Sequence, residues 1–326
     1  MKVNLLRESD DKMGDVVSLV RTRSSEEEIK NSIGEALDLI NFKPKGPAKS
    51  VDIKANLCYY WHATTGYTTD PRVVAGIIDC IRERYGTDIH IRVVEADATA
   101  MRTKHAFRML GYEKLAKEKD VELFNLSNDE IRQEKVRVNG REIVFQIPQS
   151  LLKSDLFINV PKLKIMRDTK ITCALKNIFG CIASPRKIVY HPILDEAIVG
   201  INMLLRPDLI IVDGLVALGR FPIELGLIMV SVDPFSVDWI ASQIIGYNPS
   251  KIKFLKIAMK EKLGELEGIK TRGENVITFK KIFPKENFFS SKRWWDIQMG
   301  IFKLYGKIVK DVVPPMLEKD MKSEIR

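Results

Sequence analysis

Strand-like and helical segments alternate along the first half of this chain, and the alternation restricts it to a small set of folds. The segments are strands at 51–57, 89–94 and 121–126, with helices from Asp70 and from about Thr103 between them. Strands joined by helices at this spacing are typical of parallel βαβ units. The sequence therefore predicts an α/β fold with a mostly parallel sheet flanked by helices.

A second α/β stretch follows a predicted hairpin insertion. Residues 136–145 alternate around an Asn-Gly pair, which favours a β-hairpin. The later segments are a strand at 156–160, a helix at 192–204, strands at 209–213 and 227–232, and a helix at 235–245. We expect an α/β core over residues 1–250, with a helical lead-in over 1–50 and two halves that meet near residue 150.

The positive charge of the chain lies mainly in its last quarter. The net charge is +9, and residues 251–326 hold 18 of the 52 Lys and Arg but only 10 of the 43 Asp and Glu. This predicts a basic helical C-terminal extension over 251–326, which begins with a helix at 251–263 and a short strand at 275–279. A basic, aromatic helix at about 291–312 would follow.

The predicted helix at 291–312 has two alternative roles. Its apolar stripe would either lie on an anionic membrane or pack on the core of the chain, with the lysines in solvent. Aromatic residues between lysines also suit single-stranded nucleic acid, but no nucleic-acid motif accompanies them. We expect cytoplasmic localisation, with peripheral membrane contact as the alternative. The oligomeric state is not predicted.

Several functional classes are not favoured. No uninterrupted apolar run approaches the roughly 20 residues that span a bilayer, and the charged start does not resemble a signal peptide. The four cysteines are widely spaced and include no C-x-x-C pair, so we expect no self-contained iron–sulfur cluster and no zinc ribbon.

Polar side chains follow the predicted strands, where ligands of open α/β sheets bind. These residues are Lys54, Asn56, Glu95, Lys162, Lys164, Asp213 and Asp233. Asp70 and Asp233 each precede proline, so both are alternatively helix N-caps. A divalent cation such as Mg²⁺ would be held by Asp213, Asp233 and Asp238 if their strand ends meet.

The largely apolar segment 171–180 contains Lys176 and Asn177, which need polar partners if they are buried. Thr172 and Lys176 stand four positions apart and would share one face of a helix. Lysine binds phosphate or carboxylate as a point charge. We predict that Lys162, Lys164 and Lys176 hold a small anion.

The remaining polar candidates would orient or process that anion. Asn56, Asn177 and Thr172 would position it together with Lys54. Acid–base chemistry would come from Lys176, Glu95, Asp213 or His191. His191 precedes a predicted helix, so capping or packing is its alternative role.

These motifs together resemble the family catalogued as domain of unknown function 362, over about Val51 to Gly246. The motifs are Ile53-Lys54-Ala55-Asn56, Asn159-Val160-Pro161-Lys162-Leu163-Lys164, Ala174-Leu175-Lys176-Asn177-Ile178-Phe179-Gly180 and Asp233-Pro234 to Asp238. The resemblance implies an α/β fold of prokaryotic, often archaeal, origin. Many members carry an iron–sulfur module, for which this chain has no cysteine pattern. Ile165-Met166-Arg167 stands where the family usually has a histidine.

Three functions remain as alternatives. The first is a protein that binds a small anionic ligand, with catalysis left open. The second is a non-catalytic binding or scaffold protein that uses its basic C-terminal helix on a membrane or nucleic acid. The third, an accessory to iron–sulfur or redox chemistry, is implied only by the resemblance.

Overall fold

The centre of the protein is a ten-stranded mixed sheet. The computed structural model describes residues 16–44, 46 and 48–283. Eight of its strands follow one another in the order β12 (Lys270–Gly273), β1 (Val16–Arg21), β11 (Pro222–Ser231), β10 (Leu209–Leu218), β7 (Leu156–Asn159), β2 (Ser50–Lys54), β3 (His90–Glu95) and β4 (Glu122–Asn125). The other two are β8 (Lys162–Met166), which pairs with β10, and β9 (Lys170–Thr172), which pairs with β8. The five strands from β10 to β4 run parallel to one another. The predicted α/β fold is confirmed.

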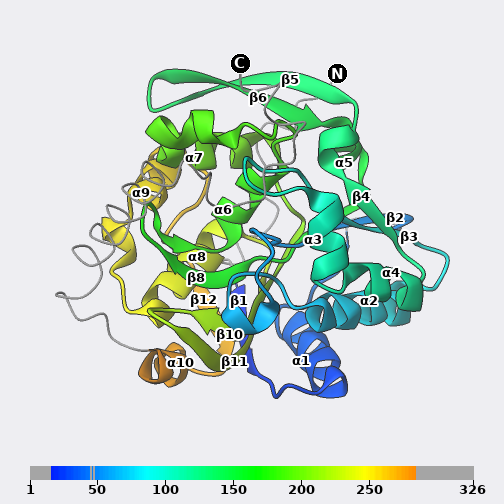
Figure 1. The fold of residues 1–326 in the computed structure, drawn as a ribbon. Coiled ribbons are helices and arrows are strands. Elements are labelled where there is room, and N and C mark those ends of the chain that lie inside the picture. Colours follow the sequence, from blue (N-terminus) through cyan, green and yellow to red (C-terminus); the bar gives the residue numbers. More distant parts are fainter. Residues whose placement is uncertain (1–15, 45, 47, 284–326) are drawn as a thin grey trace, which may run out of the picture.

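Helices cover both faces of this sheet (Figure 1). One layer contains α1 (Glu26–Leu39), α2 (Pro71–Tyr85), α3 (Thr103–Met109) and α4 (Tyr112–Lys119), and the other α6 (Ala174–Ile178), α7 (Leu194–Leu204), α8 (Pro234–Ile245) and α9 (Lys253–Lys260). Side chains of β10 alternate between the layers, because successive residues of a strand face opposite sides. Ile210 and Val212 pack with the second layer, whereas Leu209 and Ile211 pack with the first.

The predicted hairpin forms a separate two-stranded sheet of β5 (Ile131–Val138) and β6 (Arg141–Pro148), followed by α5 (Gln149–Lys153). Its turn residues Asn139 and Gly140 have φ angles of 50° and 82°, as a tight hairpin turn requires. The hairpin crosses α7 (Figure 1). A Cβ atom at Gly200 of α7 would lie 3.0 Å from the Phe145 ring, so glycine permits this close packing.

Three local predictions differ from the structure. The predicted lead-in over 1–50 also contains the strand β1. The helix expected from Thr103 is interrupted at Gly111, whose φ is 84°. The strand predicted at 275–279 is wrong, because these residues begin the helix α10 (Val276–Ile282). Asn275 caps it by accepting a hydrogen bond from the Ile277 amide at 2.9 Å, and this cap outweighs the β-branched residues that follow.

The described part of the predicted C-terminal extension packs with the α/β layers. β12 pairs in parallel with β1, and α9 packs against α7. Lys253 of α9 forms an ion pair of 3.0 Å with Asp195 of α7. The predicted helix at 291–312 lies outside the described residues. Within them, no helix is long and apolar enough to cross a membrane.

Candidate functional site

The predicted site residues gather where the parallel strands end. Lys54 is the last residue of β2, Glu95 the last of β3 and Asn159 the last of β7. Lys54 lies in register with Asn159, so neighbouring strands stop at the same level. All three side chains are buried. The sheet therefore places several polar groups at one edge, as the sequence predicted.

Lys54 and Glu95 form the first buried ion pair, with 2.7 Å between Nζ and Oε1. The Glu95 carboxylate also accepts hydrogen bonds from the Leu57 and Ala96 amides, at 3.0 and 2.9 Å. Gly180 covers the pair so closely that a Cβ atom there would lie 3.1 Å from the Lys54 ammonium. The charges of Lys54 and Glu95 balance each other inside the protein.

Lys162 and Asp213 form the second ion pair, with 2.8 Å between Nζ and Oδ2 and neither side chain exposed. Asp213 also accepts the Asp70 and Leu215 amides, at 2.7 and 3.0 Å. Lys162 follows the end of β7, as the sequence predicted, but it does not lie in a loop. It begins a strand of its own, β8 (Lys162–Met166), which pairs with β10. The pair holds β8 in place.

Lys164 is buried and has no carboxylate partner in the part of the chain that the structure describes. Its ammonium donates to the Asn56 side-chain oxygen at 2.7 Å and to the Tyr67 carbonyl at 2.8 Å. Burial lowers the pKa of Lys164 to about 8, because an uncompensated charge is costly away from water. Both acceptors are neutral. Lys54 and Lys162 each contact a carboxylate, whereas Lys164 contacts none among the described residues.

A chain of asparagine amides fixes the acceptor of Lys164. Asn56 donates to the Asn177 oxygen at 2.7 Å, and Asn177 donates to the Asn159 oxygen at 2.7 Å. Asn159 in turn donates to the Ala174 carbonyl at 2.9 Å. Since each amide nitrogen is engaged, the Asn56 oxygen is directed toward Lys164. Asn159 belongs to this site although the sequence did not single it out.

Thr172 and Lys176 lie beside Lys164, but not on one helix face as predicted. Thr172 ends strand β9 (Lys170–Thr172) and is the register partner of Lys164. Lys176 lies on α6. The Thr172 hydroxyl is buried and has no hydrogen-bond partner among the described residues. Residues that face each other on antiparallel strands share one side of the sheet, so this hydroxyl faces the same side as Lys164.

The Lys176 side chain is half-buried, and its nitrogen lies 6.0 Å from the centre of the Phe179 ring. Burial lowers the pKa of Lys176, and the charges of Cys58 and Asp168 oppose this effect. Within the described structure, Lys176 has no ion-pair or hydrogen-bond acceptor for its ammonium. It resembles Lys164 in this respect.

Lys187 is a further buried lysine that the sequence analysis missed. It begins the 3₁₀ segment η4 (Lys187–Ile193) and donates to the Asp97 and Gly180 carbonyls at 2.8 and 2.9 Å. Burial lowers the pKa of Lys187 to about 8. It precedes the exposed pair Ile188-Val189, so its sequence context does not indicate burial.

The three aspartates proposed for Mg²⁺ do not form one site. Asp213 is paired with Lys162, and Asp233 caps α8 by accepting the Ser236 amide at 2.7 Å. Asp238 accepts the Ala174 amide at 2.6 Å and the Leu175 amide at 3.2 Å. No group of three or more His, Cys, Asp or Glu residues in the described parts of the chain could hold a metal ion. The N-cap alternative is correct for Asp233, and also for Asp70, which accepts the Arg72 amide at 2.9 Å.

His191 is not placed among the buried lysines. It lies exposed in η4, just before α7. Its ring shares no hydrogen bond or ion pair with the described site residues. The structure therefore does not support the predicted acid–base role of His191.

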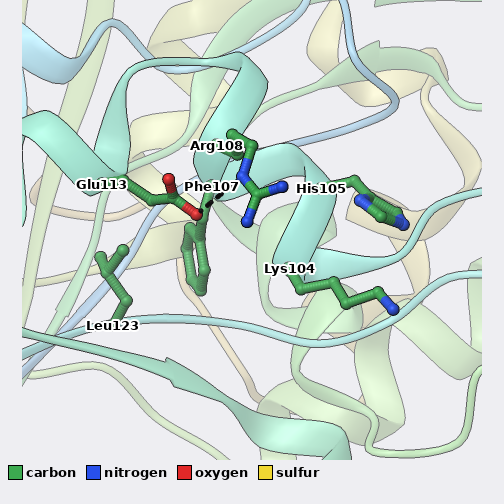
Figure 2. Close-up of a pocket in the computed structure, with 6 residues that line it drawn as sticks. All are labelled: Lys104, His105, Phe107, Arg108, Glu113 and Leu123. Carbon is green, nitrogen blue, oxygen red and sulfur yellow. Dashed lines mark hydrogen bonds and ion pairs between the residues drawn. The ribbon is translucent and has the colours of Figure 1, made fainter.

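One pocket of the described surface lies elsewhere. Figure 2 shows this cavity of about 330 Å³, which is lined by Lys104, His105, Phe107, Arg108, Glu113 and Leu123. Arg108 faces Glu113 with 3.3 Å between Nε and Oε1. None of the buried lysines lines this cavity. We therefore identify the candidate site by its unbalanced charge rather than by the volume of a pocket.

The buried site carries excess positive charge. Among the described residues, only the carboxylates of Glu95 and Asp213 pair directly with any of the five lysines Lys54, Lys162, Lys164, Lys176 and Lys187. Buried charges are normally paired, so this arrangement is suited to an anion. A lysine whose pKa lies near 8 can also exchange a proton at neutral pH.

Comparisons with known proteins place these residues within a family. A family model described as domain of unknown function (DUF362) matches residues 51–243. A thylakoid-associated protein of Synechocystis sp. is 30% identical over 132 residues, which cover 36% of this chain and 40% of the relative. The chain thus aligns with less than half the length of that relative.

Two solved structures match part of this chain at low identity. The lactate racemase apoprotein from Thermoanaerobacterium thermosaccharolyticum has a TM-score of 0.46 and 12% identity, over 73% of this chain and 59% of that one. A crystal structure of a Thermotoga maritima protein has a TM-score of 0.36 and 15% identity, over 58% and 50%.

Proposed function

The chain belongs to the family with domain of unknown function 362, and from this premise we propose that it binds a small phosphate- or carboxylate-bearing anion at Lys164 and Lys176. The observation that carries the proposal is the environment of Lys164. Its ammonium is buried and is held by two neutral oxygens, with no carboxylate in contact. A bound anion would compensate this charge.

Two neighbouring groups support the same proposal. The half-buried Lys176 adds a second positive charge, and its nitrogen has only the Phe179 ring as a described contact. The Thr172 hydroxyl, which is buried and unpaired, would donate a hydrogen bond to an anion oxygen. Two ammonium groups and a hydroxyl together suit the several oxygens of a phosphate or carboxylate.

Calorimetric titration with inorganic phosphate and with pyruvate tests the proposal. Lys164→Met should weaken binding of whichever probe binds by at least about tenfold, since a charge-assisted contact contributes roughly 1.5–3 kcal/mol. The matched control is Lys281→Met, an exposed lysine of α10, and it should bind like the unmodified chain. Circular dichroism shows whether each variant is folded. Equal binding by a folded Lys164→Met protein, or no binding of either probe by the unmodified chain, would refute the proposal.

A second candidate function is peripheral membrane contact through residues 291–312, outside the described residues. A basic amphipathic sequence favours it, and the curated relative is named as thylakoid-associated. Flotation with phosphatidylglycerol vesicles tests it, with phosphatidylcholine vesicles as the neutral control. The full chain should float only with the anionic vesicles, and replacing Lys303, Lys307 and Lys310 with Glu should abolish this. Flotation that is unaffected by the replacement would contradict the idea.

A further inference from the structure

An aromatic loop, residues 58–67, adjoins the lysine site. Two of its rings are largely in solvent, since Tyr59 is 47% and Trp61 is 55% exposed. Exposed aromatic rings of this size are good contact surfaces, because they gain much from burial. The exposure of these two rings is either incidental to a loose loop or imposed by the fold.

The backbone of the aromatic loop is held at several points. The Thr68 hydroxyl donates to the Trp61 carbonyl at 2.7 Å, and the Tyr60 hydroxyl accepts the Arg102 amide at 2.9 Å. Gly66, with a φ of 73°, packs so closely on β10 that a Cβ atom would lie 3.0 Å from the Ala217 backbone. The loop is therefore anchored, and its exposed rings stand on a fixed support.

Tyr59 has a backbone φ of 61°, which is unfavourable for a residue with a bulky side chain. Conformations of this kind persist where the surrounding structure imposes them, and they cluster at ligand-binding sites. Here the turn carries the Tyr59 side chain outward, next to the half-buried Cys58.

Three links connect this loop to the lysines. The Tyr67 carbonyl accepts the Lys164 ammonium at 2.8 Å. The Tyr67 and Trp61 rings lie with their centres 6.0 Å apart. Cys58, the first residue of the loop, lies near enough to Lys164 and Lys176 to oppose the effect of burial on the pKa of both. The exposed rings and the unbalanced ammonium groups thus belong to one region.

We propose that the anion bound at Lys164 and Lys176 carries a planar ring, which stacks on the aromatic loop at Trp61 and Tyr59. The inference rests on the proposed function and specifies its ligand class. The lysines would hold the phosphate or carboxylate, and the fixed rings would cover a face of the planar group. An aromatic ring suits a planar partner because offset stacking buries area on both.

Matched probe pairs test this inference. Adenosine 5′-monophosphate is compared with ribose 5-phosphate, and phenylpyruvate with pyruvate, so that the members of each pair differ by the ring. Stacking of one ring on an aromatic residue corresponds to about a 5- to 150-fold change in affinity. We expect the ring-bearing member of at least one pair to bind more tightly by that factor. Calorimetry on the full chain measures it.

Trp61→Ala should reduce this difference to less than about twofold while leaving the ring-free probe unaffected. The Trp61 side chain is exposed and its carbonyl remains available to Thr68, so the variant should fold. Ile277→Ala removes an equally exposed apolar side chain, 56% in solvent, from the distant α10 and serves as the control.

The outcomes separate the two proposals. Equal binding within both pairs would overturn the planar-ring inference and leave the anion site intact. Absence of binding by all four probes would overturn the proposed function and this inference with it. A ring preference that survives in Trp61→Ala and in Tyr59→Gly would place the contact elsewhere and also refute the inference.

Discussion

The Lys164 ammonium lies 2.7 Å from the uncharged side-chain oxygen of Asn56, and the two residues are 108 positions apart in the chain. This bond keeps a buried positive charge in place without neutralising it. The two other fully buried lysines of the sheet, Lys54 and Lys162, each contact a carboxylate instead. A carboxylate in place of the amide at position 56 would give Lys164 the same kind of partner that Lys54 and Lys162 have.

Asn56→Asp should close the site. A carboxylate next to Lys164 would raise the pKa of that lysine and compensate its charge, so anion affinity should fall at least about tenfold. The variant also loses the donor to Asn177, with a cost of about 1 kcal/mol in unfolding free energy. Calorimetry at pH 7 and urea unfolding measure the two effects. Unchanged affinity in the folded variant would argue against a role for Lys164.

Anion binding should weaken as the pH rises above 8. The pKa of Lys164 is about 8, so its ammonium is lost above that pH and affinity should fall by up to about tenfold per pH unit. Titrations between pH 6 and 9.5 measure this. Lys164→Met should leave only a weak pH dependence, and a full remaining decline in that variant would implicate Lys187 instead.

Lys164 should also make the protein more stable at high pH. Its pKa falls from 10.5 in the unfolded chain to about 8 in the folded one, so between these values the unfolded state binds more protons. Unfolding free energy should therefore rise from pH 8 to pH 10. Urea midpoints at the two pH values check the slope, which should be smaller in Lys164→Met.

Asp238→Asn should remove a pH dependence near neutrality. Burial raises the pKa of Asp238 to about 7 from 3.8, although the Ala174 and Leu175 amides donate to it. The folded state then binds the extra proton, so stability falls as the pH rises from 4 through 7. Asn retains size and an acceptor, and its urea midpoint should change less between pH 5 and 8. Identical slopes in both proteins would contradict the assignment.

Breaking the ion pair of Lys162 and Asp213 should destabilise the protein. Lys162→Met leaves a buried carboxylate with two amide donors but no cation, at a cost of about 3–5 kcal/mol. Adding Asp213→Asn should recover part of that loss, because the remaining side chain is neutral. Chemical unfolding of the two single variants and the double variant gives the coupling. Additive losses would show that the pair is not coupled.

The sequence was sufficient for the α/β fold because the strands of a covered parallel sheet are apolar on both faces. It also singled out most of the lysines and asparagines of the site, but it missed Asn159 and Lys187. It did not identify the partner of each lysine. Lys164 and Asn56, for example, are 108 positions apart, and they meet only because β2, β7, β10 and β8 are neighbours in the sheet. Thr172 was expected to share a helix face with Lys176, but it is the last residue of β9. The helix α6, which carries Lys176, begins two residues later.

The position of β1 in the sheet affects how the chain folds during synthesis. β1 pairs with β11 and β12, and Ser18 meets Val230 at a separation of 212 residues. At about 5–20 residues per second, β1 leaves the ribosome roughly 10–40 s before its first neighbour exists. An unpaired apolar strand is a template for aggregation. Until β11 is made, β1 therefore has no strand of this sheet to pair with, and we expect the nascent chain to be most prone to association in this interval.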